Sequence, residues 1–318
     1  MSGLTTSNIS YLTRAQLYSS EIKELLLDQL FAQQWVKWMT DFPDGDVINI
    51  PMVGQMEAMD YAENQAVKYQ AIDTGNWDFT ITEYKQAGTY VTKKLKQDAW
   101  LMSQVEPTLV PRMQRALAKQ MELDVLSQGP RGQTADSLNT INGANHRFVA
   151  SGTNKVITLE DFAKVMYALQ MANVPDTNVI GIVHPSVAYH LATQTNVVNL
   201  LSPVPQWTGL VENGFTQGMK FVRNVYGIDI YTSQNLYVNT AAEATLGAVA
   251  GDVNNIFFSV TPDVMPLVGA IRQAPQVDTD YNMQRQRDEY VVTCRYGFGF
   301  QRPENFVTVL TSTGQVYA

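Results

Sequence analysis

Two short strand patterns enclose a long polar segment in the first third of the chain. Val47 to Ile50 predicts a strand that ends at Pro51, and Trp77 to Thr82 alternates apolar and polar residues as a half-buried strand does. The residues between them, Met52 to Asn76, are too many for a hairpin turn. Connections of that length are uncommon in compact domains unless they have a function. We therefore interpret this segment as an arm that reaches a neighbouring molecule.

Helical spacing follows the second strand pattern, which continues to Thr92. Apolar residues then recur every three or four positions in two runs, Leu95 to Val105 and Leu109 to Leu123. Because proline breaks the interior of a helix but fits its first turn, Pro107 and Pro111 predict a break near Glu106 and a long helix that starts at these prolines. Gly129-Pro130 predicts the end of this helix.

An amphipathic helix is predicted near the N-terminus. Between Arg14 and Met39, apolar side chains recur at mostly helical spacing, and Trp35 and Trp38 add a bulky apolar end. Such a helix would pack on the protein's own core or, as an arm, partly on another subunit. The sequence leaves both alternatives open.

A mixed region of helices and strands is predicted after the Gly-, Asn- and Ser-rich loop from Arg131 to Lys155. Thr158 and Asp161 have capping-box spacing at the start of a helix that ends near Asn173. Three strands and a second helix follow: Val179 to Val183, Pro185 to Leu191 (the helix), Tyr226 to Tyr231, and Ile256 to Val260.

A long half-buried strand is predicted near the C-terminus. From Tyr290 to Gln301, aromatic and apolar side chains alternate with smaller or polar ones, so that each set shares one face. Arg302 to Asn305 predicts a turn into Phe306 to Thr311. We therefore expect the chain to close with paired strands.

Composition narrows the function classes. The chain has 318 residues, enough to bury a sizeable core, yet only 16% of them are charged and 45% are hydrophobic. This balance indicates that other subunits cover part of the surface. The net charge of -8 argues against a protein whose main role is binding phosphate backbones, because that role needs clustered Lys and Arg.

The cysteine count and the N-terminal residues indicate in which cellular compartment the chain is made. Cys294 is the only cysteine, which excludes an intrachain disulfide and a thiolate metal cluster and fits a reducing compartment. The sequence contains neither a secretory signal pattern nor an apolar run of about 20 residues. We expect synthesis in the cytoplasm and no membrane partner.

The order of these elements resembles that of the major capsid proteins of tailed bacteriophages, the Hong Kong 97 fold. Four runs are similar to the family: VINIPMVG (47–54), ITEYKQAGTYVTKKLKQDAW (81–100), VIGIVHPSVAYHL (179–191) and NVYGIDIYTSQNL (224–236). The resemblance covers nearly the whole chain and implies an α+β fold. It implies these parts: an N-terminal arm (1–44), a β-hairpin-like extended loop (45–92), a peripheral domain with a long spine helix (93–157), an apical domain (158–278) and the closing strands of the peripheral domain (279–318).

The same resemblance implies a structural protein of the virion, with no enzymatic activity and no cofactor. Copies of the chain would assemble into hexamers and pentamers of an icosahedral shell, which encloses double-stranded DNA without sequence-specific binding. Other expected partners are a portal and a decoration protein. A separate scaffolding protein is also expected, or a scaffolding segment removed earlier, because only residues 1–44 precede the extended loop. Two other classes stay open: an encapsulin-like nanocompartment shell, and an enzyme whose site is assembled from distant residues.

Candidate catalytic and metal-binding residues are few. His146, His184 and His190 lack an H-E-x-x-H context or carboxylates at ligand spacing, and no G-x-S-x-G pattern surrounds Ser186. The glycine-rich segments match neither a phosphate-binding loop nor a dinucleotide fingerprint. Four acidic residues could hold a cation, but the arginines among them favour a mixed-charge interface or a solvated loop: Asp278, Asp280, Asp288 and Glu289, with Arg285 and Arg287.

Charge placement predicts a contact between subunits. The polar segment is mainly acidic and the predicted spine region mainly basic, so we predict that the acidic loop of one subunit lies over the spine of its neighbour. A solvated acidic loop is the alternative. The candidate interface residues are Glu57, Asp60, Tyr61, Glu63, Lys68 and Tyr69 on the loop, and Lys94, Arg112, Arg115 and Lys119 near the spine. The family resemblance adds one chemical alternative, an isopeptide bond from Lys68 to an Asn of a neighbour, which most members of the fold lack.

Overall fold

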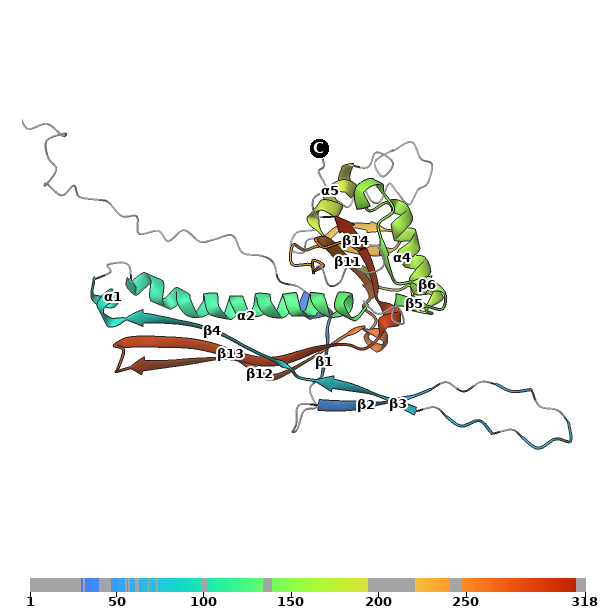
Figure 1. The fold of residues 1–318 in the computed structure, drawn as a ribbon, viewed down its shortest axis with the longest axis horizontal. Coiled ribbons are helices and arrows are strands. Elements are labelled where there is room, and N and C mark those ends of the chain that lie inside the picture. Colours follow the sequence, from blue (N-terminus) through green and yellow to red (C-terminus); the bar gives the residue numbers. More distant parts are fainter. Residues whose placement is uncertain are drawn as a thin grey trace, which may run out of the picture.

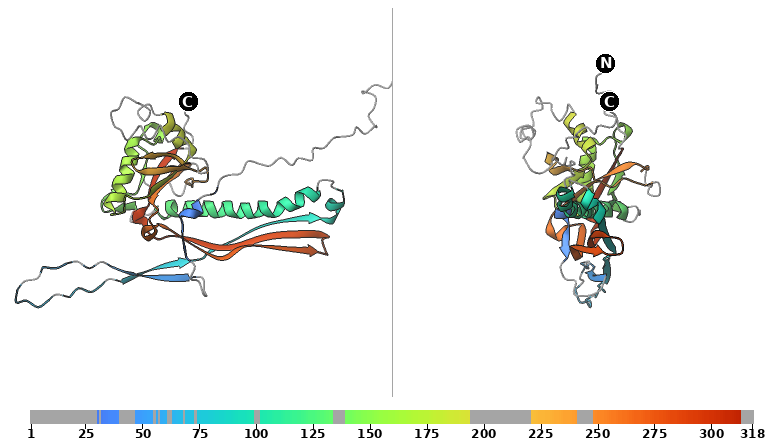
Figure 2. Two further views of the ribbon diagram at one scale, coloured as in Figure 1. Left: turned by 180° about the vertical axis from the view of Figure 1, so that it is seen from behind. Right: turned by 90° about the vertical axis from the view of Figure 1, so that its left-hand side faces the viewer.

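The computed structural model shows three connected parts (Figure 1). It describes residues 30, 32–39, 47–54, 56, 58–60, 63–67, 69–72, 74–98, 102–133, 139–193, 221–240 and 248–312. A unit built on a six-stranded sheet lies over one end of a long helix. A four-stranded sheet lies along the other side of that helix, and a two-stranded ribbon leaves from beneath this sheet (Figures 1 and 2). The predicted mixture of helices and strands is confirmed.

The six-stranded sheet has the strand order β7-β14-β11-β8-β10-β9. Its strands are β7 (Arg147–Val149), β14 (Val307–Ser312), β11 (Asp252–Ser259), β8 (Val179–Val183), β10 (Ile228–Thr232) and β9 (Phe221–Val225). Every residue of β8 is buried, as its wholly apolar sequence predicts. β8 pairs in parallel with β10 and antiparallel with β11, which places it inside the sheet.

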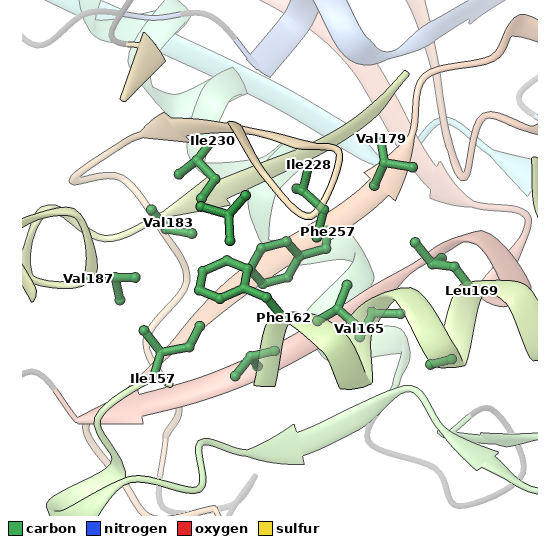
Figure 3. Packing of buried hydrophobic residues seen from close by; sticks show 14 of the residues in the cluster. Ile157, Phe162, Val165, Leu169, Val179, Val183, Val187, Ile228, Ile230 and Phe257 are labelled. Carbon is green, nitrogen blue, oxygen red and sulfur yellow. The ribbon is translucent and has the colours of Figure 1, made fainter. Parts of the chain in front are cut away.

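Two helices cover one face of this sheet, α4 (Leu159–Met171) and α5 (Pro185–Thr193). Phe162 and Leu169 of α4 and Val187 of α5 point toward Phe257 and Ile228 of the sheet (Figure 3). The rings of Phe162 and Phe257 meet edge to face, with centroids 5.7 Å apart. Because all of these side chains are buried, this cluster is a main source of stability for the unit.

The start of α4 is fixed by the predicted capping box. Asp161 is fully buried, and its carboxylate accepts hydrogen bonds from the backbone N–H and the hydroxyl of Thr158, at 2.8 and 3.1 Å. The backbone N–H of Ser151 also donates to this carboxylate. The charge of Asp161 is therefore satisfied inside the fold, and it ties α4 to the preceding loop.

The four-stranded sheet has the order β1-β12-β13-β4 and carries the long helix α2 (Met102–Gly132) on one face. Its strands are β1 (Lys37–Met39), β12 (Leu267–Asn282), β13 (Arg287–Phe300) and β4 (Glu83–Thr92), and the short helix α1 (Lys93–Asp98) follows β4. Met113, Leu117 and Met121 of α2 pack on Val292 and Tyr296 of β13. The predicted apolar face of this strand is thereby confirmed.

A partly buried hydrogen bond fixes α2 over the sheet. The Tyr296 hydroxyl donates to Oδ2 of Asp124 at 2.6 Å, and Gln120 donates to the other carboxylate oxygen at 2.9 Å. Burial, together with the negative charge of Asp124, raises the pKa of Tyr296 above its usual range. The phenol therefore stays protonated and remains a donor.

The predicted break near Glu106 is wrong, because α2 continues through both prolines. Pro107 and Pro111 are four residues apart and lie on the same side of the helix, and Pro111 is exposed. Each proline removes one backbone hydrogen bond, but the opposite side is held by the packing of Met113 and Leu117 on the sheet. The 31 residues of α2 extend about 46 Å.

The predicted helix end at Gly129-Pro130 is also wrong, by a few residues. The helix runs to Gly132, and Gln133 N–H still donates to the carbonyl of Gly129 at 3.0 Å. A Cβ at position 129 would overlap the ring of Phe306. This glycine therefore allows close packing between helix and sheet and does not terminate the helix.

The predicted N-terminal helix is wrong where the structure describes it. Ala32–Trp35 is a single turn of 3₁₀ helix, and Lys37–Met39 forms β1, which pairs in parallel with Val268–Ala270 of β12. Trp35 is buried and Trp38 is packed on Phe298, so contacts with the core decide the conformation against the helical periodicity. The part of the prediction before Leu30 lies outside the described residues.

The predicted pairing of the last two strands is wrong, although the turn between them is present at Pro303–Asn305. β13 belongs to the four-stranded sheet and β14 to the six-stranded sheet. Buried Asn305 explains the change of sheet, because its amide donates to the carbonyls of Ser259 and Val264 at 2.8 and 2.7 Å. These bonds hold the turn against the end of β11.

One predicted strand begins two residues late. Tyr226 and Gly227 both have positive φ, 52° and 84°, and form the tight turn between β9 and β10. The predicted loop after Arg131 contains the hairpin of β5 (Thr140–Ile141) and β6 (Ala144–Asn145), then a 3₁₀ turn at Thr153–Lys155. Another 3₁₀ turn lies at Pro262–Val264.

Candidate subunit interface

The predicted arm is a ribbon of two antiparallel strands, β2 (Val47–Val53) and β3 (Thr74–Thr80). Their register runs from Val47 opposite Thr80 to Val53 opposite Thr74. The predicted end of the first strand at Pro51 is wrong, because β2 continues to Val53; β3 begins three residues before the predicted Trp77 and ends two residues before Thr82. The ribbon leaves the body beneath the four-stranded sheet, on the side away from α2, and extends in the direction opposite to the tip of the β12–β13 hairpin (Figure 1).

Two glycines of β13 position the root of the arm. Tyr296 and Phe298 point toward α2, so Gly297 and Gly299 lie on the other face of the sheet, where Phe79 and Ile81 are buried. A Cβ on Gly297 would lie 2.9 Å from Cα of Ile81, and one on Gly299 would lie 2.8 Å from the Phe79 ring. The absence of side chains at these positions lets the arm lie directly on the sheet.

The sequence of β13 contains a signal for this contact. Gly297 and Gly299 alternate with large aromatic residues along one strand, and glycine inside a strand often marks the close approach of another element. The spacing shows on which face of β13 the approach occurs. It does not show that residues 77–81 make it.

Beyond its root, the described part of the arm exposes many apolar side chains. Tyr69 is 93% exposed and Val53 is 72% exposed. The others are Val47, Met56, Met59, Val67 and Ile72. A two-stranded ribbon is at best marginally stable alone in water, and contiguous exposed apolar surface marks interaction sites. The arm therefore has the character of a binding element.

The predicted acidic residues are only partly described. Asp60, Glu63 and Asp78 are exposed on the arm, and Asp78 accepts a hydrogen bond from the amide of Asn76 at 3.1 Å. Three predicted residues of this segment lie outside the described residues: Glu57, Tyr61 and Lys68. The alternative of an isopeptide bond through Lys68 therefore lies outside the described residues.

The predicted basic residues form a stripe on α2. Arg112, Arg115 and Lys119 follow each other at three and four positions, on the side of the helix opposite Met113 and Leu117. Arg112 and Lys119 are exposed, and Arg115 is partly buried. Lys94 is exposed on α1. Within one chain the acidic arm and this stripe are not brought together, because they lie on opposite sides of the four-stranded sheet (Figures 1 and 2).

The distal end of the four-stranded sheet carries ion pairs and exposed apolar side chains. Arg287 Nε lies 2.6 Å from Oε1 of Glu289, and its guanidinium stacks 4.2 Å from the centre of the Tyr90 ring. Lys96 pairs with Asp288 at 2.6 Å. Hydrogen bonding to Arg287 lowers the pKa of Glu289. Met283, in the hairpin turn, is 77% exposed, so this end has a mixed apolar and charged surface.

Two of the four acidic residues that could hold a cation, Asp288 and Glu289, are thus paired with Lys96 and Arg287. Among the described residues, no group of three or more His, Cys, Asp or Glu side chains is placed to hold a metal ion. No helix in the described part of the chain is both long and apolar enough to span a membrane.

The contact between His184 and Ser186 has a local structural role. Nδ1 of His184 lies 2.8 Å from the Ser186 hydroxyl and accepts a weaker hydrogen bond from the Ser186 backbone N–H at 3.3 Å. Burial lowers the pKa of His184, which keeps the ring neutral and able to accept these bonds. The arrangement caps the first turn of α5 and accounts for both residues without catalysis.

Comparisons with known proteins bear on the fold. No family model and no curated protein matches the sequence. Among solved structures, the capsid of cyanophage P-SCSP1u is similar with a TM-score of 0.68 and 14% identity, over 98% of this chain and 95% of that one.

Two further capsid structures are similar over nearly the full length. The mature capsid of bacteriophage PhiM1 has a TM-score of 0.67 and 12% identity, over 96% of this chain and 93% of that one. The capsid of Ralstonia phage GP4 has a TM-score of 0.67 and 9% identity, over 100% of both chains. The chain therefore has the fold of these phage capsid proteins.

Proposed function

We propose that this chain is the major capsid protein of a tailed bacteriophage, a structural protein without enzymatic activity. Copies of it assemble into hexamers and pentamers of an icosahedral shell that encloses the double-stranded DNA genome in the virion. The observation that carries the proposal is the arm, whose apolar side chains are exposed on a fold similar to phage capsid proteins. An exposed, apolar, two-stranded arm is the kind of element that a second copy covers.

The parts named for the Hong Kong 97 fold can be assigned to the observed sheets. We assign the extended loop to the β2–β3 arm, the spine helix to α2, the peripheral domain to the four-stranded sheet with α1 and α2, and the apical domain to the six-stranded sheet with α4 and α5. This assignment moves β4 from the extended loop to the peripheral domain and β14 to the apical domain. A boundary at residue 278 would divide β12, so the sheets are the better guide.

The proposed partners follow from the role as a shell. Besides further copies of the chain, they are a portal, a separate scaffolding protein and a decoration protein. Contact with the enclosed DNA is not sequence-specific. Assembly takes place in the host cytoplasm.

For the contact between copies, we propose that the acidic arm of one copy binds the basic residues of its neighbour. Asp60 and Glu63 of one copy would face Arg112, Lys119 and Lys94 of a neighbour. The arm leaves from the sheet face opposite α2, so the neighbour must present the exposed side of its α1 and α2 to the arm. Met59 and Tyr69 supply adaptable apolar contact beside these charges.

Electron microscopy of the purified chain tests the proposed function. Hollow icosahedral particles or flat hexamers are expected, because each weak interface is repeated many times in a closed shell. A chain that stays monomeric at high concentration would overturn the proposal. Particles that enclose a protein cargo in place of DNA would favour the nanocompartment alternative.

Charge reversal tests the proposed interface. Asp60→Lys combined with Glu63→Lys should reduce assembly while the isolated chain stays folded, since exposed ion pairs contribute about 0.2–1 kcal/mol each and are repeated in every copy. Adding Arg112→Glu and Lys119→Glu should restore part of the assembly. Glu160→Lys, an exposed charge on α4, is the matched control. Normal assembly of the Asp60 and Glu63 variant would contradict this interface and leave the proposed shell intact.

A further inference from the structure

Residues 32–39, which we call the strap, contact all three elements that meet at the centre of the molecule. The first contact is with α2. The backbone N–H of Ala32 donates to Oε2 of Glu122 at 2.9 Å, and the Gln33 amide donates to the carbonyl of Ala118 at 3.4 Å. Both Ala32 and Glu122 are buried. A carboxylate inside a protein needs polar partners, and the Ala32 N–H is one of them for Glu122. This bond holds the strap on α2.

The second contact is with the six-stranded sheet. Trp35 is buried, and its ring lies 4.8 Å from the ring of Tyr231 on β10. It belongs to the same apolar cluster as Val125 of α2 and Ile182 of β8. The indole ring thus takes part in the packing between helix and sheet.

The third contact is with the four-stranded sheet. Lys37, Trp38 and Met39 pair in parallel with Val268, Gly269 and Ala270 of β12. The Trp38 ring lies 5.8 Å from Phe298 of β13. Eight consecutive residues therefore contact a helix and two sheets. α2 also packs directly on β13, and its C-terminal end is joined to the six-stranded sheet unit by one apolar cluster and by hydrogen bonds between Gln133 and both Phe306 and Thr308.

We propose that the strap sets the angle between the six-stranded sheet unit and the layer formed by α2 and the four-stranded sheet. Units joined by such interfaces move relative to each other unless the interface is large and apolar. Trp35 supplies apolar area at this interface, and β1 fixes the strap to the other sheet. Loss of Trp35 leaves a cavity between helix and sheet, and the two units then sample a wider range of angles. This role does not depend on shell assembly.

A distance measurement between two spin labels tests the proposal in the full chain. Tyr167→Cys on α4 and Met283→Cys at the hairpin tip place one label on each unit, at positions that are 56% and 77% exposed. Cys294 is the only native thiol and is buried, so labels attach to the two new sites. Labelled chains are diluted into unlabelled chains, so that distances between copies do not contribute. The original chain should give one narrow distance distribution, and Trp35→Ala a broader or shifted one.

Trp38→Ala is the matched control, because the Trp38 ring packs on Phe298 of the four-stranded sheet and the substitution leaves the backbone pairing of β1 with β12 in place. It should keep the narrow distribution. If Trp35→Ala does not fold, Trp35→Phe retains a ring toward Tyr231 and should broaden the distribution to a smaller extent. A folded Trp35 variant with an unchanged distribution overturns the proposal, and so does equal broadening in Trp38→Ala.

Discussion

The six-stranded sheet and the arm are both made of β-strands, but they differ in what covers them. Residues of β8 and β11 are buried on both faces by α4, α5, α2 and the strap, all from the same chain. The arm has one covered end, at Phe79, and exposes Val53 and Tyr69 further along. The first region is stable through its own packing, whereas the second is completed by what it meets.

The largest effect is expected from a substitution in the core of the six-stranded sheet unit. Phe257 is fully buried between Phe162 and the sheet, and its ring packs where a side chain on Gly181 would lie. Phe257→Ala should lower the free energy of unfolding by about 3–5 kcal/mol, because it removes apolar area and leaves a cavity. Urea denaturation followed by circular dichroism measures this loss.

The matched change on the arm is Val53→Ala. It should alter the free energy of unfolding by less than about 0.5 kcal/mol, since the side chain is already exposed. If both variants lost similar stability, the arm would be part of the cooperative core and the comparison would fail.

A smaller effect is expected at the root of the arm, where it packs on β13 of the four-stranded sheet. Gly297→Ala places a methyl group against the backbone of Ile81 and Thr80, which no change of rotamer can relieve. We expect a loss of about 1–3 kcal/mol and a displaced arm. Gly75→Ala is the control, because a Cβ there meets nothing within 4 Å. Unfolding curves of the two variants should differ, and equal curves would show that Gly297 is not needed for close contact.

The sequence predicts the local elements of the fold better than their partners. The spacing of Thr158 and Asp161, the apolar run of β8 and the alternation along β13 each identify an element, because the signal lies within a few neighbouring residues. The strap escaped prediction since Trp35 and Trp38 fit a helix as well as a strand. Only contacts with Tyr231 and Phe298, distant in sequence, decide between them.

For the candidate interface, too, the sequence predicts the local element better than its partner. The overlong polar segment predicts an arm, and its exposed apolar side chains are consistent with that prediction. The acidic and basic residues were paired from charge alone, yet the arm and α2 lie on opposite sides of the four-stranded sheet (Figure 2). Charge patterning carries no information about which face of a layer a residue occupies, so the pairing between copies stays a prediction.

A further distinction between the regions is their response to acid. The three histidines, His146, His184 and His190, all lie in or beside the six-stranded sheet unit. Burial lowers the pKa of each, and His146 is fully buried. Between the lowered pKa and about 6.5, the unfolded chain binds more protons than the folded chain. The free energy of unfolding should therefore fall as pH decreases below about 6.5, by at most about 1.4 kcal/mol per pH unit for each histidine.

His146→Gln should reduce this slope, whatever it does to the stability at neutral pH. Urea denaturation at several values between about pH 7.5 and 5.5 measures the slope before most carboxylates titrate. The arm contributes no histidine, so its variants should keep the original slope. A slope that is unchanged in His146→Gln would show that this ring is not the group that titrates.

The smallest expected effect on the isolated chain is that of Tyr69→Ala, and it separates the two regions most sharply. Tyr69 is 93% exposed, so its loss should change the free energy of unfolding by less than about 0.5 kcal/mol. If a second copy covers it, the same change should weaken each contact by more than about 1 kcal/mol, as buried tyrosines at interfaces commonly do. The concentration needed for assembly, measured by light scattering, should rise, while Tyr167→Ala on α4 leaves it unchanged. Because the proposed shell would repeat the contact in every copy, even a modest loss per contact would become visible in assembly when it is invisible in unfolding.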